Sequence, residues 1–306
     1  MKVLVTGADG FVGRWLVRRL EELGHRVIAA GGPPGEVAAG RVTLDVTDAA
    51  TFGPALSAPV DAVVHLAAVA SGAESARDPA VAWSVNATGT ALLAGAVGQL
   101  KATGGVDPVF LYASTAEVYG VGPAAPRQET DPVAPCSPYA ASKAAGEIAV
   151  LEVWRRLGLR VVVARAFPHT GPGQDARFVA PAFAQRLRVA KRRGAPAVKV
   201  GRLEPVRELL DVRDVVDAYV ALLTKGAPGE TYNVCGGESL SVGELFRRLA
   251  AILEVRAVPE VDATLTRTSD IPHLVGDPSK LRAATGWRPE RTLTETLTDL
   301  AHAQTD

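Results

Sequence analysis

A glycine-rich turn close to the start of the chain limits the possible folds more than any other feature. The stretch Thr6-Gly-Ala-Asp-Gly-Phe-Val-Gly13 follows an apolar strand predicted at residues 3–5 and precedes an amphipathic helix predicted at residues 14–23. In this context the glycines let the backbone turn tightly and approach a pyrophosphate, whose charge lies against the free N–H groups of the helix. The pattern therefore predicts a parallel α/β sheet with a dinucleotide at its first turn.

The candidate cofactor contacts begin in this turn. They are Gly7, Gly10, Phe11, Val12 and Gly13. The spacing is G-x-x-G-x-x-G rather than G-x-G-x-x-G, and a glycine turn that serves only the fold is the alternative interpretation. Further contacts are expected at the ends of later strands, at Asp45, Val46, Leu66, Ala67 and Ala68.

The cofactor's identity depends on the end of the second strand, predicted at residues 26–30. Gly31 stands where an acid would normally bind the adenosine ribose hydroxyls. Without that acid nothing repels a ribose phosphate, so we expect NAD or NADP, with NADPH tolerated. Arg14 could reach such a phosphate or be an ordinary exposed helix residue, and Asp45 could contact adenine or begin a turn.

A tyrosine and a lysine four residues apart form the second informative motif. Pro138 suits a first helical turn and Ser137 can cap it, which predicts Tyr139 and Lys143 on one face of a helix. An ammonium near a phenol favours the phenolate and lowers the tyrosine pKa toward the range of general acid–base catalysis. Tyr-x-x-x-Lys alone is common by chance, so its weight comes from the neighbouring motifs.

Two hydroxyl side chains, Ser114 and Thr115, follow a strand predicted at residues 109–113. Because open α/β sheets place their sites at the carboxyl ends of strands, we expect both to hydrogen-bond a substrate oxygen beside Tyr139. Such a group moves a proton to or from an alcohol or carbonyl. His65 is expected to be packed rather than catalytic, and Asn86 to be a buried strut inside a helix predicted at residues 78–100.

Composition excludes several classes of protein. Lys plus Arg and Asp plus Glu balance at 33 each, so no overall field favours nucleic acid or an anionic membrane. Cys136 and Cys235 form neither a disulfide framework nor a zinc spacing, and we expect no metal site. We expect a cytoplasmic enzyme, a homodimer, with no nucleic-acid or membrane partner.

The order of the elements predicts the fold class. It is α/β, a Rossmann-type doubly wound parallel sheet with a smaller, interleaved α/β substrate lobe at the C-terminal side. The nucleotide-binding domain should span residues 1–166, with return segments near 206–236. The second lobe should comprise residues 167–205 and 237–306.

Further motifs follow in a specific order. They are His65-Leu-Ala-Ala, Asn86-Ala-Thr-Gly, Gly171-Pro-Gly-Gln174, Asp211-Val-Arg-Asp214 and Gly286-Trp-Arg-Pro289. Over essentially its whole length the chain thereby resembles the extended short-chain dehydrogenase/reductase family that acts on nucleotide-diphosphate sugars, the NAD-dependent epimerase/dehydratase type. Within that family its tail and its Gly-Pro-Gly-Gln loop are most similar to GDP-4-keto-6-deoxymannose reductases.

The resemblance implies roles by position. Tyr139 would be the acid–base residue, Lys143 would hold the nicotinamide ribose, and Thr115 would bind the reacting oxygen. The implied substrate contacts are Ser114, Thr115, Glu117, Arg207 and Arg267, the two arginines gripping the diphosphate. For Arg207, which lies between Glu204 and Glu208, a salt bridge is the competing interpretation.

Two departures from the family pattern bear on the chemistry. Ala116 stands where the dehydratases that act on dTDP-glucose carry an acid, which disfavours dehydration although Glu117 remains. Pro168 replaces an asparagine that contacts the substrate diphosphate, and it has no backbone N–H to donate. The resemblance thus favours NAD(P)-dependent reduction of the 4-keto group of a nucleotide-diphosphate 4-keto-6-deoxy sugar. The alternatives are a UDP-hexose 4-epimerase with tightly bound NAD and a non-catalytic cofactor sensor.

Overall fold

The computed structural model describes residues 1–32, 41–104, 106–236, 238–265 and 271–303. Seven parallel strands form its large sheet, in the order β11-β6-β5-β4-β1-β2-β3. They are β1 (Lys2–Thr6), β2 (Arg26–Gly31), β3 (Val42–Thr43), β4 (Ala62–His65), β5 (Val109–Thr115), β6 (Arg160–Ala166) and β11 (Thr231–Val234). The 3-2-1-4-5-6 order within it is that of a doubly wound dinucleotide-binding sheet, so the predicted fold class is confirmed.

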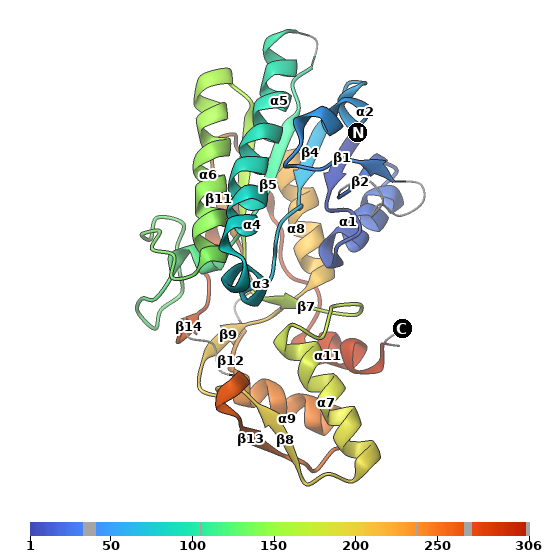
Figure 1. The fold of residues 1–306 in the computed structure, drawn as a ribbon, viewed down its shortest axis with the longest axis vertical. Helices are drawn as coiled ribbons and strands as arrows, with labels where there is room; N and C mark the ends of the chain where they lie inside the picture. Colours follow the sequence, from blue (N-terminus) through green and yellow to red (C-terminus); the bar gives the residue numbers. More distant parts are fainter. Residues whose placement is uncertain (33–40, 105, 237, 266–270, 304–306) are drawn as a thin grey trace.

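Helices cover both faces of this sheet (Figure 1). On one face lie α1 (Phe11–Glu22) and α8 (Val212–Lys225), which share a core with β1. On the other lie α2 (Phe52–Leu56), α5 (Thr90–Ala102) and α6 (Pro138–Leu157), which share a second core with β4, β5 and β6. Because the strands are buried on both faces, they read as continuous apolar runs rather than alternating ones.

A second lobe lies below the sheet in Figure 1 and has its own apolar core. Its helices are α7 (Val179–Arg193), α9 (Val242–Ile252) and α11 (Leu293–His302). Its strands form small sheets from β8 (Ala197–Val200) with β13 (Val258–Val261), and from β9 (Val206–Glu208) with β12 (Ser239–Ser241) and β14 (His273–Leu274). After β9 the chain returns to the large sheet through α8 and β11.

The remaining elements connect these layers. They are α3 (Gly72–Arg77), α4 (Pro79–Trp83), β7 (His169–Thr170), β10 (Leu210–Asp211), α10 (Ser279–Thr285), a π-helical turn (Ser84–Gly89) and 3₁₀ turns at Ala49–Thr51, Ala116–Tyr119 and Ala263–Leu265. From Pro79 to Ala102 the helical run is continuous, and its length and composition alone would let it cross a membrane. It packs against α6, as a core helix of a folded domain does.

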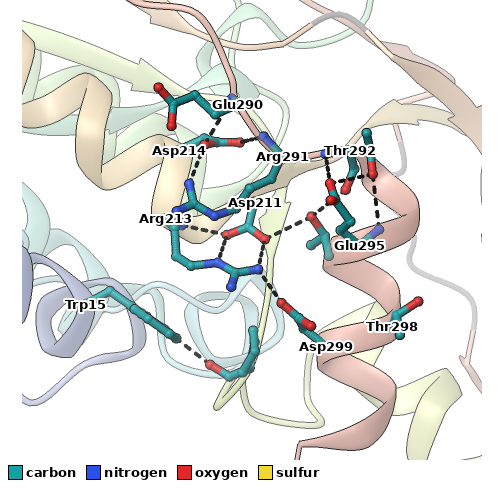
Figure 2. Close-up of polar contacts among 12 residues, drawn as sticks. Trp15, Asp211, Arg213, Asp214, Glu290, Arg291, Thr292, Glu295, Thr298 and Asp299 are labelled. Atoms are coloured by element: carbon teal, nitrogen blue, oxygen red, sulfur yellow. Dashed lines mark hydrogen bonds and ion pairs between the residues drawn. The ribbon is translucent and has the colours of Figure 1, made fainter.

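The first turn of α8 ties the two lobes together (Figure 2). Asp211 caps this helix and receives two hydrogen bonds from the guanidinium of Arg213, which also reaches Asp299 on α11. Asp214 accepts from the backbone N–H groups of residues 290 and 291 and from Nη1 of Arg291. The C-terminal helix α11 is thereby held against α8, which covers one face of the large sheet.

Candidate active site

Two glycines of the turn, Gly7 and Gly13, leave no room for a side chain. A Cβ atom on Gly7 would lie 2.8 Å from the backbone nitrogen of Ala67, and one on Gly13 would lie 2.1 Å from the carbonyl oxygen of Gly7. Gly10 is the N-cap of α1 without a side-chain cap, and no acid lies in the first helical turn. This bare, positively polarised helix end fits an anion such as a pyrophosphate.

Leu66, Ala67 and Ala68 lie directly beside this turn, since the N–H of Ala67 donates to Oγ1 of Thr6. Asp45 is engaged locally: its Oδ1 accepts from the backbone and the hydroxyl of Thr47, so in this structure it makes a turn. Val46 is buried against Gly89. Arg14 donates to the carbonyls of Asp9 and Gly173, which ties the turn to the loop after β7.

The sheet and α6 bring the predicted catalytic residues together. Ser114 and Thr115 are the last two residues of β5, at its carboxyl end. Ser137 caps α6 by accepting from the N–H of Ala140, and Pro138 occupies its first turn. Tyr139, in the first turn of α6, is partly exposed and lies close enough to Thr115 for that side chain to act on its phenol, whereas Lys143 is buried one turn further on.

The pKa of Tyr139 is raised rather than lowered, contrary to the sequence prediction. Burial penalises the phenolate most, the carboxylate of Glu117 adds to this, and the side chain of Thr115 opposes it. Spacing along the helix predicted Tyr139 and Lys143 on one face of α6, but it could not predict the desolvation of the phenol. In this structure the tyrosine holds its proton at neutral pH, as a proton donor must.

Lys143 is itself strongly affected by burial, which lowers its pKa to about 7 although Glu147 favours the charged form. Its Nζ lies 4.2 Å from the centre of the Tyr112 ring. The ammonium thus titrates near neutral pH in a largely apolar setting.

Comparison with known proteins agrees with this geometry. The model of the NAD dependent epimerase/dehydratase family matches residues 3–235. The chain belongs to that family. This confirms the predicted resemblance, and it means that the chain is a member of an NAD-dependent family of enzymes.

One curated sequence and two solved structures are similar to this chain over nearly its full length. GDP-6-deoxy-D-mannose reductase of Pseudomonas aeruginosa is 36% identical, covering 97% of this chain and 94% of its own. The structure of RMD from P. aeruginosa complexed with NADPH is 34% identical with a TM-score of 0.84, covering 98% and 97%. That of Thermus thermophilus UDP-glucose 4-epimerase complexed with NAD is 31% identical with a TM-score of 0.85, covering 98% of each chain.

Two buried polar residues of this chain, Asn86 and His65, hold the segments around the site in place. Asn86 is fully buried, accepts from the N–H of Val69 and donates to the carbonyl of Val69 and to Ser142 on α6. His65 lies between the hydroxyls of Thr6 and Thr90, and burial lowers its pKa to about 3. Asn86 is the strut that the sequence predicted, and His65 is packed.

Sequence reasoning missed Glu147 and Arg165. Glu147 accepts a hydrogen bond from Oγ of Ser114 at 2.5 Å, and Arg165 binds both of its oxygens, at 3.0 and 2.8 Å. All three side chains are buried. The available signal was the four-residue spacing from Lys143 to Glu147, which continues the face that begins at Tyr139.

The predicted substrate contacts are spread over both lobes. Glu117 follows Thr115 in a 3₁₀ turn, and its charge acts on Tyr139. Arg207 lies on β9 of the second lobe, and its Nη1 donates to the carbonyl of Val206. Its neighbour Glu208 is buried and accepts from the N–H groups of Gly236 and Gly276. Arg267 lies outside the described residues.

Pro168, which replaces the family asparagine, joins the large sheet to the loop that leads into the second lobe. Its carbonyl accepts from the N–H of Leu210, at the parallel pairing of β7 with β10. The loop beyond it is fixed to α1, because the indole N–H of Trp15 donates to Pro172 and Phe11 stacks on His169. Helix α1, which bears the glycine turn, is thus in direct contact with the connection to the second lobe.

Proposed function

We propose that this enzyme reduces the 4-keto group of a nucleotide-diphosphate 4-keto-6-deoxy sugar, with Tyr139 giving a proton to the C4 oxygen. The observation that carries this proposal is the position of the Tyr139 phenol: it lies in the first turn of α6, beside Thr115 at the carboxyl end of β5, at the same sheet edge as the glycine turn. The 36% identity to a GDP-6-deoxy-D-mannose reductase supports the substrate class.

Each residue has a distinct part in this reaction. When bound, a nicotinamide cofactor supplies the hydride. Gly7, Gly10 and the first residues of α1, Phe11 to Gly13, hold its pyrophosphate at the bare helix end. Lys143 binds the nicotinamide ribose, and Thr115 donates a hydrogen bond to the reacting oxygen while Tyr139 transfers its proton.

The substrate's diphosphate calls for guanidinium groups, and we assign Arg207 and Arg267 to it. Arg207 stands on the second lobe, so its engagement would draw that lobe toward the sheet. This assignment agrees with a nucleotide-binding domain built mainly from residues 1–166 and a substrate lobe built from later segments.

The cofactor preference and the assembly are part of the same proposal. Gly31 ends β2 without an acid, so NADPH is accepted alongside NADH. Val81, Trp83 and Leu92 on the helical run from Pro79, and Ile148 on the neighbouring α6, expose large apolar side chains. A second copy of the chain would cover them in a homodimer.

The second candidate is a UDP-hexose 4-epimerase, favoured by the full-length likeness to the Thermus enzyme. An epimerase uses the same tyrosine and keeps its NAD bound, because the keto sugar turns over between two hydride transfers. A reductase must exchange its cofactor in every cycle.

Absorbance of the reduced nicotinamide at saturating sugar nucleotide decides between the two. A reductase consumes NADPH or NADH in a one-to-one ratio with a 4-keto-6-deoxy sugar nucleotide and is inactive without added cofactor. Interconversion of UDP-hexoses by the purified protein, without net absorbance change, would establish the epimerase instead. Purified protein that processes neither class contradicts both.

A further inference from the structure

Beneath the candidate catalytic residues, helix α6 carries a polar line that runs into the protein interior. Tyr139, Lys143 and Glu147 are four residues apart and share one face of the helix. Tyr139 is partly exposed, whereas Lys143 is 3% and Glu147 5% exposed. The line therefore leads from the candidate reaction site to a buried carboxylate that the proposed mechanism does not use.

Arg165 fixes this carboxylate from β6. Its Nε and Nη2 donate to the two oxygens of Glu147 at 3.0 and 2.8 Å, a bidentate geometry that holds both side chains in place. The same guanidinium lies 4.8 Å from the centre of the Tyr119 ring. Arg165 is 6% exposed, so the pair is formed away from solvent and has little freedom to rearrange.

Ser114 is the third member of the cluster, and its protons can be counted. A hydroxyl has one proton, and a carboxylate can only accept, so the 2.5 Å contact uses the proton of Ser114 on Glu147. The oxygen of Ser114 then offers only lone pairs to its other neighbours. Of the groups near the reacting oxygen, Thr115 and Tyr139 keep protons to donate.

A glycine makes this contact possible. A Cβ atom on Gly146 would lie 2.1 Å from the hydroxyl oxygen of Tyr112 on β5. Without a side chain there, α6 packs close enough to β5 for the hydroxyl of Tyr112 to donate to the carbonyl of Lys143. The next residue, Glu147, then meets Ser114, two positions after Tyr112 on the same face of the strand.

We propose that Glu147 is a positioning residue of the active site: clamped by Arg165, it takes the only proton of Ser114 and fixes a negative charge one helical turn from Lys143. Ser114 is accordingly an acceptor in the site and not a donor to the carbonyl. The inference rests on the proposed function where it concerns the reaction, but its effect on Lys143 is independent of any substrate.

Among the charged and titratable groups around Lys143, Glu147 is the residue to substitute in a test. They are Tyr139 and Glu147 on α6, Tyr112 on β5, His65 on β4 and Arg165 on β6. His65 is neutral across the working range because its pKa is lowered to about 3, and burial holds the pKa of Tyr112 well above its usual value. Glu147 is the charge that raises the pKa of Lys143 against the effect of burial.

The direct test is NMR titration of protein selectively labelled with ¹³C in lysine. One lysine should titrate near pH 7, and Lys143→Met identifies its signal by removing it. In Glu147→Gln the titration should move down by about one pH unit or more, because an opposite charge within reach favours the ammonium. An unchanged titration in Glu147→Gln overturns the proposal.

Asp214→Asn is the matched control, since Asp214 is another buried carboxylate bound by an arginine but lies on α8. It should leave the lysine titration where it is in wild type. A shift as large as that of Glu147→Gln would mean that loss of a buried carboxylate, and not its position, is the cause, and would overturn the proposal. If the single variant does not fold, Glu147→Gln/Arg165→Gln leaves no unpaired charge and should still move the titration down, by less than Glu147→Gln alone because the positive charge of Arg165 is lost as well.

Kinetics test the effect on Ser114. Glu147→Asp keeps the charge but is one carbon shorter, so the lysine titration should stay within a few tenths of a unit of wild type while kcat falls at all pH values. In Glu147→Gln the alkaline limb of the kcat profile should also move to lower pH. A Glu147→Asp enzyme with wild-type kcat would show that the bond to Ser114 has no part in positioning. Wild-type protein that reduces no keto sugar would contradict the proposed function but leave the titration result standing.

Discussion

Helices α6 and α8 both begin with polar residues at the boundary between the lobes, yet they use them differently. On α6 the polar groups follow one face inward, from Tyr139 through Lys143 to Glu147. On α8 they are concentrated in and just before the first turn, at Asp211, Arg213 and Asp214 (Figure 2). On α6 the charged side chains therefore extend into the core, and on α8 they join the two lobes.

The two buried carboxylates show what the difference means. Both Glu147 and Asp214 are bound by an arginine, so burial and ion pairing are common to both. Asp214 takes its other hydrogen bonds from two backbone N–H groups, which only hold the chain. Glu147 takes its other hydrogen bond from Ser114, next to a residue assigned to the reaction. Both carboxylates have an arginine, so the arginine does not distinguish their roles. The other hydrogen-bond donor does: a side chain of the candidate active site for Glu147, and backbone N–H groups that join the lobes for Asp214.

Tyr139→Phe should show the largest effect and separate the two helices most clearly. A phenyl ring packs like the phenol but carries no proton, so we expect kcat to fall by roughly 10²–10⁴-fold with little change in stability. Asp214→Asn should do the reverse, lowering the melting temperature while kcat changes little. Steady-state kinetics and thermal unfolding of both variants measure this. A Tyr139→Phe enzyme within a few-fold of wild type would refute the proton-donor role.

Removal of the two arginines compares the carboxylates directly. Arg165→Met leaves Glu147 with only Ser114 in a buried setting, and an unpaired buried charge costs about 3–5 kcal/mol of unfolding free energy. Arg291→Met leaves Asp214 with two backbone donors, so about 1–3 kcal/mol is expected. Urea unfolding of both variants provides the numbers. Equal losses would mean that the backbone donors to Asp214 contribute nothing.

The sequence predicted the local features of α6 and of the glycine turn. Ser137 and Pro138 specified the start of α6, and the glycine turn specified β1 and α1, because caps and tight turns depend on neighbouring residues alone. The strand predicted at residues 109–113 is also present, as part of β5.

What the sequence could not supply is contact between distant segments. The bond from Ser114 to Glu147 joins residues 33 positions apart on different elements, and no spacing rule reports it. The short strand β9 pairs with β12 and β14, which come much later in the chain, and its own three residues do not predict these partners. The predicted direction of the Tyr139 pKa shift was wrong for the same reason, because the burial of a side chain depends on the whole fold.

The pH dependence of stability gives the smallest and sharpest contrast between the helices. Burial lowers the pKa of Lys143 from 10.5 in the unfolded chain to about 7, so above pH 7 the unfolded state binds more protons and folding must release one. The destabilisation by Lys143 is therefore full below pH 7 and declines as pH rises toward 10. Lys143→Met removes it. Its stability advantage over wild type should shrink by at most about 1.4 kcal/mol per pH unit between pH 7 and 9.5.

Arg291→Met on the α8 side provides the control for this measurement. Its guanidinium stays charged throughout the range, so the difference from wild type should not change with pH. Urea midpoints for the three proteins at half-unit steps from pH 6 to 9.5 give both curves. A flat difference for Lys143→Met would mean that Lys143 keeps an ordinary pKa in the fold. The contribution of Lys143 on α6 to stability would then depend on pH no more than that of Arg291, the partner of Asp214 on α8.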